Sequence, residues 1–184
     1  MTDPLQPESQ PSSLDYSFPE GLHPRLQGLA WMVGHWEGHG QTQWPGSEDV
    51  EILEQLDMSH NGEPYLHYLL QTYRRGADGE LGDPVSMETG FWIPGEGNDV
   101  EVVITNPEGV AQKWFGTITG LQSPAGGELA TKIELTTDAV LSSGTHTAGH
   151  RIYGYINNKM MFAYDRADTD VALQPHLTGE LERK

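Results

Sequence analysis

Residues 85–105 read VSMETGFWIPGEGNDVEVVIT, and this stretch shows the pattern that decides the fold. Two runs rich in valine, isoleucine, threonine and aromatic residues flank the turn-forming residues 94–98, PGEGN. Runs of this kind, bounded by glycine, proline and asparagine, are typical of neighbouring β-strands. The stretch therefore predicts a hairpin with strands at 85–93 and 99–105.

The same alternation of strand-like runs and turn signals fills most of the chain. It predicts eight further strands, near residues 34–43, 51–59, 64–74, 110–119, 128–137, 145–156, 159–166 and 173–182. One short amphipathic helix is expected over residues 24–32, where leucines recur at helical spacing and Pro24 suits the first turn.

Short links between so many strands favour an antiparallel up-and-down meander. The sheet must close or stack, because an open sheet leaves unpaired edges. A barrel of about ten strands is wider than the roughly eight that side chains alone can fill. The sequence therefore predicts an all-β protein, an up-and-down antiparallel barrel of about ten strands with one short N-terminal helix and a cavity for a small ligand.

The charge balance excludes several classes of partner. The chain has 10 Lys and Arg residues and 27 Asp and Glu residues, which gives a formal net charge of −17. Such a chain repels phosphate, so we expect neither nucleic acid nor an anionic membrane surface as a partner. The chain has no cysteine, which excludes disulfides, thiol nucleophiles and iron–sulfur clusters.

The chain divides into a short tail and one domain. Residues 1–20 are rich in proline and serine and predict a disordered tail, followed by a single barrel domain over residues 21–184. The first residues lack the basic-then-apolar order of a signal peptide, and no apolar run approaches the length of a membrane helix. We therefore expect a cytoplasmic protein.

The stretch GHWEGHG over residues 34–40 alternates strictly. As a strand it places its members on two faces, Gly34, Trp36, Gly38 and Gly40 on one and His35, Glu37 and His39 on the other. In the favoured interpretation, the tryptophan points inward and the glycines let strand and helix backbones approach closely or bend the barrel wall. In a second, the two histidines and the glutamate bind a metal ion. A phosphate-binding loop is disfavoured, because no lysine follows and the net charge is negative.

A second informative stretch is LQPHL over residues 173–177, which opens the last predicted strand. Pro175 fixes its own φ, removes a backbone donor and biases Gln174 toward an extended form. A histidine beside so rigid a neighbour, at the end of a barrel, could present a nitrogen to the cavity. The alternative is a partly buried His176 whose nitrogens are bonded within the protein.

Together these two stretches resemble a known family. The glycines and tryptophan of residues 34–40, followed by Trp44 and Pro45, are similar to the signature of the nitrobindin family, and residues 173–177 resemble that family's C-terminal segment. The resemblance extends over Leu22–Glu182. It implies a ten-stranded barrel that binds one ferric haem b per chain, with His176 as the axial iron ligand. It also implies binding of NO and, if the protein is an enzyme, isomerisation of peroxynitrite to nitrate, with the small molecules haem, NO and peroxynitrite as its partners.

Several positions depart from the family pattern. The resemblance places three residues of this chain at the haem site. Relatives commonly carry a threonine at the position of Gly46 and a histidine, on the open side of the haem, at that of Ser86. At the position of Thr147 they carry a lysine that could meet a haem propionate. Arg166 takes the place of an apolar methionine.

These departures leave two questions open. Arg166 could pair with a haem propionate or with Asp165 or Asp168 at the surface, and we expect the surface pair. The altered pocket also leaves room for an alternative function, a non-catalytic, lipocalin-like carrier of a fatty acid or another apolar ligand.

Overall fold

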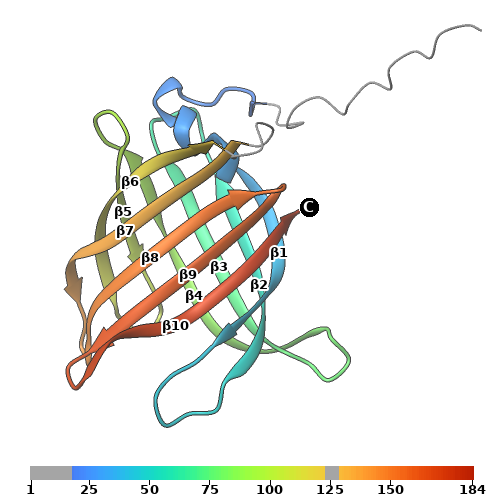
Figure 1. Cartoon of the computed structure of the whole chain (residues 1–184), viewed down its shortest axis with the longest axis vertical. Coiled ribbons are helices and arrows are strands. Elements are labelled where there is room, and N and C mark those ends of the chain that lie inside the picture. The colour runs from blue at the N-terminus through green and yellow to red at the C-terminus, as the bar shows by residue number, and fades with distance from the viewer. Residues whose placement is uncertain (1–17, 123–128) are drawn as a thin grey trace, which may run out of the picture.

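The computed structural model describes residues 18–122 and 129–184. Apart from its last three residues, the tail predicted for residues 1–20 lies outside the described residues. The described chain forms a closed antiparallel barrel with a short helix, η1, at Pro24–Met32 (Figure 1). The strands are β1 (Gly34–Thr42), β2 (Val50–Ser59), β3 (Leu66–Arg75), β4 (Leu81–Pro94), β5 (Asp99–Thr105), β6 (Ala111–Gln122), β7 (Leu129–Leu141), β8 (His146–Ile156), β9 (Lys159–Asp168) and β10 (Val171–Arg183).

Each strand pairs with its neighbour in the chain, and β1 pairs with β10 to close the sheet. The predicted ten-stranded up-and-down barrel is therefore confirmed, and the predicted hairpin is β4 and β5. β4 begins earlier than expected because Leu81 and Pro84 still pair with β3. Pairing across the sheet, rather than local sequence, sets where that strand starts.

Side chains on the inner faces of the strands build one core. Its large members include Trp36, Leu56, Tyr68, Trp92, Trp114, Ile133, Tyr153 and Leu181, none more than 1% exposed. Trp36 points inward, as the alternation of residues 34–40 predicts, and its indole Nε1 donates a hydrogen bond of 2.8 Å to the Met32 carbonyl. That bond ties the start of β1 to η1.

The glycines of β1 let the barrel wall close. A Cβ atom at Gly38 would lie 1.9 Å from the carbonyl oxygen of Glu180, and one at Gly40 would lie 1.9 Å from that of Thr178. Any side chain would therefore collide with the backbone of β10. The close approach expected between strand and helix backbones is instead one between two strands, because the partner of these glycines is β10.

Helix η1 lies at the end of the barrel where β1 begins (Figure 1). It is a 3₁₀ helix that buries Leu26, Leu29 and Met32 in the core. The Arg25 guanidinium holds it against the β4–β5 turn by donating to the Pro94 carbonyl at 2.6 Å. Within the described residues, no helix has the length and apolar character that crossing a membrane requires.

Candidate functional site

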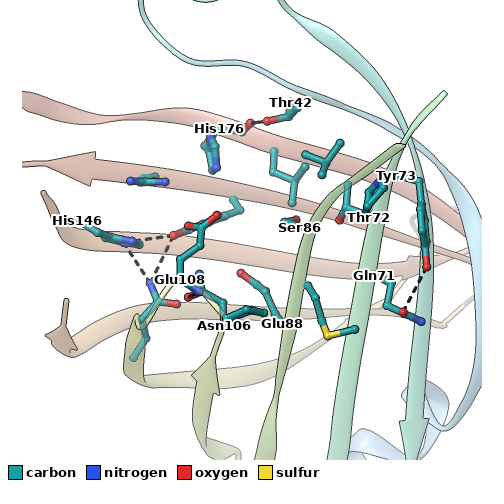
Figure 2. Close-up of a pocket in the computed structure, with 18 residues that line it drawn as sticks. Thr42, Gln71, Thr72, Tyr73, Ser86, Glu88, Asn106, Glu108, His146 and His176 are labelled. Carbon is teal, nitrogen blue, oxygen red and sulfur yellow. Dashed lines mark hydrogen bonds between the residues drawn. The ribbon is translucent and has the colours of Figure 1, made fainter. Parts of the chain in front are cut away.

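The barrel has a pocket of about 540 Å³ at the end where β1 finishes and β10 starts, away from η1 (Figure 2). That volume is within the usual range for a small-molecule site, roughly 300–1,000 Å³. Its wall includes Thr42, Thr72, Ser86, Met87, Glu88, Asn106, Glu108, Gln112, His146, Tyr164, Arg166, His176 and Leu177. The lining residues come from seven of the ten strands and from the β5–β6 turn, and none of them comes from η1, so the site belongs to the barrel itself.

His176 reaches the pocket through a β-bulge. On β10, Pro175 pairs with Asp165 and Leu177 with Tyr164, so that His176 is an extra residue in the ladder. A bulge turns its strand locally and re-aims side chains. As a result His176 and Leu177, although adjacent in sequence, both line the pocket.

Gln43 holds the His176 residue from two sides. The Gln43 N–H donates to the His176 carbonyl at 2.9 Å, and the His176 ring nitrogen Nδ1 lies 3.1 Å from the Gln43 carbonyl oxygen. A carbonyl only accepts, so Nδ1 carries the proton and Nε2 keeps its lone pair. Burial lowers the pKa of His176, against the opposing effect of the Gln43 bond, so the imidazole is neutral at pH 7.

Two aromatic rings fix the orientation of the imidazole. Trp44 and Tyr164 pack edgewise on it, with ring centroids 5.3 and 5.5 Å away. Trp44 comes from the aromatic-proline step that follows β1, so the two sequence stretches singled out by their pattern meet in space. A neutral histidine held in one tautomer and one orientation is suited to bind a metal centre.

The other predicted pocket residues are placed differently. Ser86 lines the pocket from β4, on the side of the barrel away from β10. Gly46 and Thr147 are not among the lining residues. Gly46 is exposed in the β1–β2 loop, where its φ of +79° favours glycine. Thr147 is exposed on β8, and its neighbour His146 faces the pocket instead.

His146 is a pocket residue that strict strand alternation misses. Alternation groups it with His150 and predicts a surface position, yet His146 is only 9% exposed. A register shift between His146 and Ala148 places His146 on the inner face, which it shares with Arg151. Its Nε2 accepts from the Gln112 side-chain amide at 3.1 Å, and burial lowers its pKa.

Arg166 forms the expected pair with Asp168, but the pair lies at the pocket wall rather than on the open surface, with side chains 26% and 10% exposed. Its Nε and a terminal guanidinium nitrogen donate to the two carboxylate oxygens of Asp168 at 2.8 and 3.0 Å. The guanidinium also lies over the Trp44 ring, 4.9 Å from its centroid, and lines the pocket. Arg166 therefore joins the pocket wall while its charge is balanced by Asp168.

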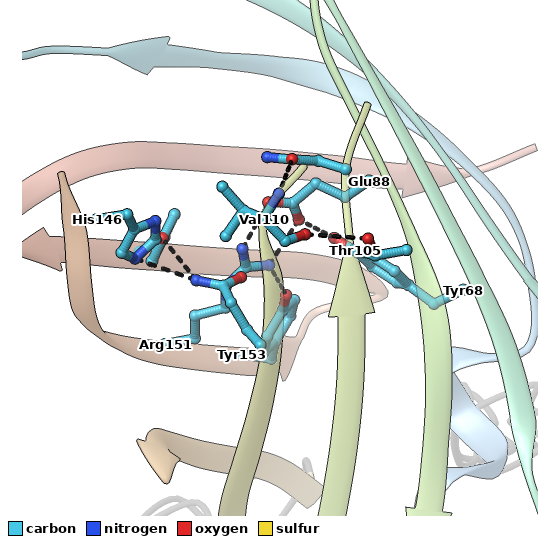
Figure 3. Close-up of polar contacts among 10 residues, drawn as sticks. Tyr68, Glu88, Thr105, Val110, His146, Arg151 and Tyr153 are labelled. Carbon is cyan, nitrogen blue, oxygen red and sulfur yellow. Dashed lines mark hydrogen bonds and ion pairs between the residues drawn. The ribbon is translucent and has the colours of Figure 1, made fainter. Parts of the chain in front are cut away.

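A buried ion pair lies at the inner side of the pocket (Figure 3). The Arg151 guanidinium donates to both carboxylate oxygens of Glu88, at 2.7 and 2.9 Å, and their side chains are 1% and 13% exposed. The hydroxyl of Tyr68 donates to the same carboxylate at 3.1 Å. Burial raises the pKa of Glu88, but the charge and hydrogen bonds of Arg151, together with the hydrogen bond from Tyr68, leave the pKa below its ordinary value.

This ion pair connects with the histidine site. The Arg151 guanidinium lies 4.1 Å from the ring centroid of Tyr164, which packs on His176. Composition alone could not single out Glu88 among 27 carboxylates. The sequence does offer one indication of its place. Glu88 lies two residues before Gly90 and four before Trp92, so strand alternation puts all three on the inner face of β4.

The hypothesis of a metal ion at His35, Glu37 and His39 is wrong for this structure. In the ranges 18–122 and 129–184, no group of three or more histidine, cysteine or acidic residues is arranged to hold a metal ion. His35 is instead engaged on both nitrogens, by Asp57 at 2.7 Å and Glu37 at 3.2 Å. These two hydrogen bonds raise the pKa of His35, and the bond to Asp57 has the larger effect. His35 and its acidic partners therefore form ion pairs on the surface.

Comparisons with known proteins agree with this architecture. A family described as "THAP4-like, heme-binding beta-barrel domain" matches residues 25–183. A ferric nitrobindin-like protein of Cutibacterium acnes is 38% identical over 175 residues, which cover 92% of this chain and 99% of the relative. A peroxynitrite isomerase of a Nocardioides species is 33% identical over 174 residues, with coverage of 93% and 100%.

A solved structure has the same fold. The crystal structure of Rv2717c from M. tuberculosis aligns with a TM-score of 0.78 at 28% identity, over 89% of this chain and 99% of that one. The family match spans all ten strands of the barrel. The chain therefore belongs to the family of THAP4-like, haem-binding β-barrels that includes the nitrobindin-like proteins.

Proposed function

We propose that this protein binds one ferric haem b per chain in the pocket at the open end of the barrel, with His176 as the axial iron ligand. The observation that carries the proposal is the state of His176, a neutral imidazole whose Nδ1–H is bonded to the Gln43 carbonyl. That bond leaves Nε2 as the unprotonated nitrogen, which is the form that binds iron. The residues present therefore fit the group.

Further pocket residues would act on the same ligand. Val85 and Met87 supply apolar surface on the β4 wall, and the Arg166 guanidinium at the pocket wall is placed to meet an acidic group. Because Arg166 already pairs with Asp168, we expect it to contribute less to affinity than His176 does.

The experiment is a hemin titration of the purified apo protein, followed by its Soret absorbance. We expect saturation at about one equivalent in the wild type and loss of the specific Soret change in His176→Ala. His39→Ala is the matched control, since His39 is exposed on β1 and does not line the pocket. Undiminished hemin uptake by His176→Ala would refute the assignment of the ligand.

We further propose that the haem-loaded protein acts on reactive nitrogen species, binding NO and isomerising peroxynitrite to nitrate. The name of the Nocardioides relative supports this activity. Bound ferric haem supplies a Lewis-acid iron with one open coordination position. The chain contributes a fixed imidazole on one side and, on the β4 side, the Ser86 hydroxyl, which can donate a hydrogen bond.

Ser86 sets an expectation for the rate. A serine reaches less far than the histidine common in relatives, so we expect slower peroxynitrite decay than in members that carry histidine there, and a faster decay in Ser86→His. Stopped-flow measurements at matched haem occupancy test this. Equal rates for the wild type and Ser86→His would contradict a role for Ser86 at the open side.

The alternative, a lipocalin-like carrier of a fatty acid, has less support. Such a ligand needs a long apolar interior, but fully buried side chains, among them Trp36, Trp92 and Trp114, fill the barrel below the pocket. Arg151, which is a buried cation among the described residues, is already bound to Glu88. Native mass spectrometry of protein purified without added hemin separates the two functions, since a co-purified lipid would favour the carrier.

A further inference from the structure

A second polar site lies inside the barrel, apart from the histidine. Glu54 of β2 is 1% exposed, and neither of its carboxylate oxygens has a hydrogen-bond partner among the described residues. Thr72 of β3 stands opposite it in the ladder, is equally buried, and has an unpartnered hydroxyl. Buried polar atoms in native proteins are nearly always bonded, either to protein or to ordered water. Three such atoms on facing positions of two strands therefore point to a ligand between or beside them.

The fold leaves room for the buried carboxyl. A Cβ atom at Gly179 of β10 would lie 2.2 Å from Glu54 Oε2 and 2.4 Å from Phe162 Cε1. Only a glycine lets the Glu54 side chain occupy that position. The carboxyl is thus accommodated by the opposite wall of the barrel.

Few charged groups face Glu54 from the elements around it. They are Glu88 on β4 and Arg151 on β8, whereas β9 and β10 present Phe162 and Gly179. Burial, aided by the negative charge of Glu88, raises the pKa of Glu54 to about 8, against the opposing effect of Arg151. At neutral pH the carboxyl is therefore protonated and offers one donor as well as acceptor sites.

We propose that Glu54 and Thr72 form an internal binding site for ordered water, and that this water lies at the inner end of the pocket, whose wall includes Thr72. A buried water needs two to four polar partners, and the carboxyl and the hydroxyl together supply that number. The site then gives the pocket a buried carboxyl that can release or take up a proton through water. It involves residues of the chain only and does not depend on haem binding.

High-resolution crystal structures of the full-length wild type and of Glu54→Gln and Glu54→Met test the proposal. We expect a water within hydrogen-bond distance of both Glu54 and Thr72 in the wild type. Glu54→Gln keeps the bonding groups and should retain that water, whereas Glu54→Met should lose it. A direct bond between Glu54 and Thr72 with no water, or a dry space beside them, would overturn the proposal.

Denaturant unfolding provides an independent readout. Replacing an orphaned polar group by an apolar one of similar shape stabilises a protein, whereas removing one partner of a bound water leaves the other unsatisfied. At pH 4, where the Glu54 carboxyl is largely protonated in both the folded and the unfolded chain, we therefore expect Glu54→Met and Thr72→Val each to lower the unfolding midpoint, with a combined effect smaller than the sum of the two. A raised midpoint in either single variant would refute a shared water. If Glu54→Met does not fold, the structures of the wild type and Glu54→Gln decide the question.

Discussion

The buried pair of Glu88 and Arg151 offers a sharp test of the energetics of this barrel. Arg151→Met removes the guanidinium and keeps much of its volume. The Glu88 carboxylate then remains 13% exposed in the wall of the barrel without its counter-charge. Since the ion pair is bidentate, with contacts of 2.7 and 2.9 Å, the variant loses both charge-assisted bonds at once.

The expected magnitude follows from this burial. Two unit charges about 4 Å apart attract each other by about 4 kcal/mol at an effective dielectric constant of about 20. Breaking a buried pair by removing one partner typically costs about 3–5 kcal/mol, because an uncompensated charge stays behind. We therefore expect the free energy of unfolding of Arg151→Met to fall by about 3–5 kcal/mol at pH 7.

The assay is urea unfolding of the wild type, Arg151→Met, Glu88→Gln and the double variant. Glutamine can still accept from the Tyr68 hydroxyl, so the double variant should recover about 2 kcal/mol relative to Arg151→Met. Lys132→Met is the control. It breaks a surface pair with Glu134, 2.6 Å long and 35% and 47% exposed, and should cost less than about 1 kcal/mol.

The contribution of Glu88 to the free energy of unfolding should depend on pH in opposite directions in the wild type and in Arg151→Met. In the wild type the pKa of Glu88 lies below its ordinary value of 4.5, so its contribution to stability is present above that pH and is lost as the pH falls through the lowered pKa. In Arg151→Met the effects of the guanidinium are lost and only the Tyr68 hydrogen bond still opposes burial, the largest single effect, so the pKa of Glu88 rises and the variant loses stability relative to the wild type as the pH rises. A loss equal to that of Lys132→Met, or one independent of pH between 5 and 7, would refute the reasoning.

Two further predictions concern the Glu54 site. Because the pKa of Glu54 is raised from 4.5 to about 8, the free energy of unfolding of the wild type should fall by roughly 5 kcal/mol between those pH values. Glu54→Gln should lack this pH-dependent loss, so parallel pH profiles of the two proteins would contradict the prediction. Gly179→Ala places a Cβ atom against Glu54 and Phe162 and should cost about 1–3 kcal/mol in urea unfolding. Gly120→Ala, where nothing lies within 4 Å of the added atom, is the control, and an equal effect of both would argue against a packed site.

Much of the architecture could be predicted from local patterns. Alternating β-branched and aromatic runs separated by turn residues give the number and order of the strands, because side chains in a strand point to opposite faces with a period of two. The same period places Trp36 inward and His35 outward on β1. The histidine of the last strand is recognisable from its sequence neighbours, Pro175 and Leu177, and the structure places it in the pocket wall.

The composition of the site could not be predicted in the same way. His146 lies in the pocket and Thr147 outside it because a bulge shifts the ladder between β8 and β9. A bulge depends on the partner strand and leaves no clear signal in its own strand. The residues that contact His176, among them Tyr164 and Gln43, come from separate strands and loops that only the closed barrel brings together.

The sequence by itself determined the strand order, the closure of the sheet into a barrel, and the family resemblance carried by two stretches at the chain's opposite ends. Only the tertiary structure decided which polar side chains share the interior. The pairing of Glu88 with Arg151 and the burial of Glu54 opposite Thr72 join strands that are distant in sequence. The physical reason is that the alternation of inward and outward side chains repeats every two residues and can be read within one strand. Which side chains meet across the barrel depends instead on the register between strands, and the whole closed sheet sets that register.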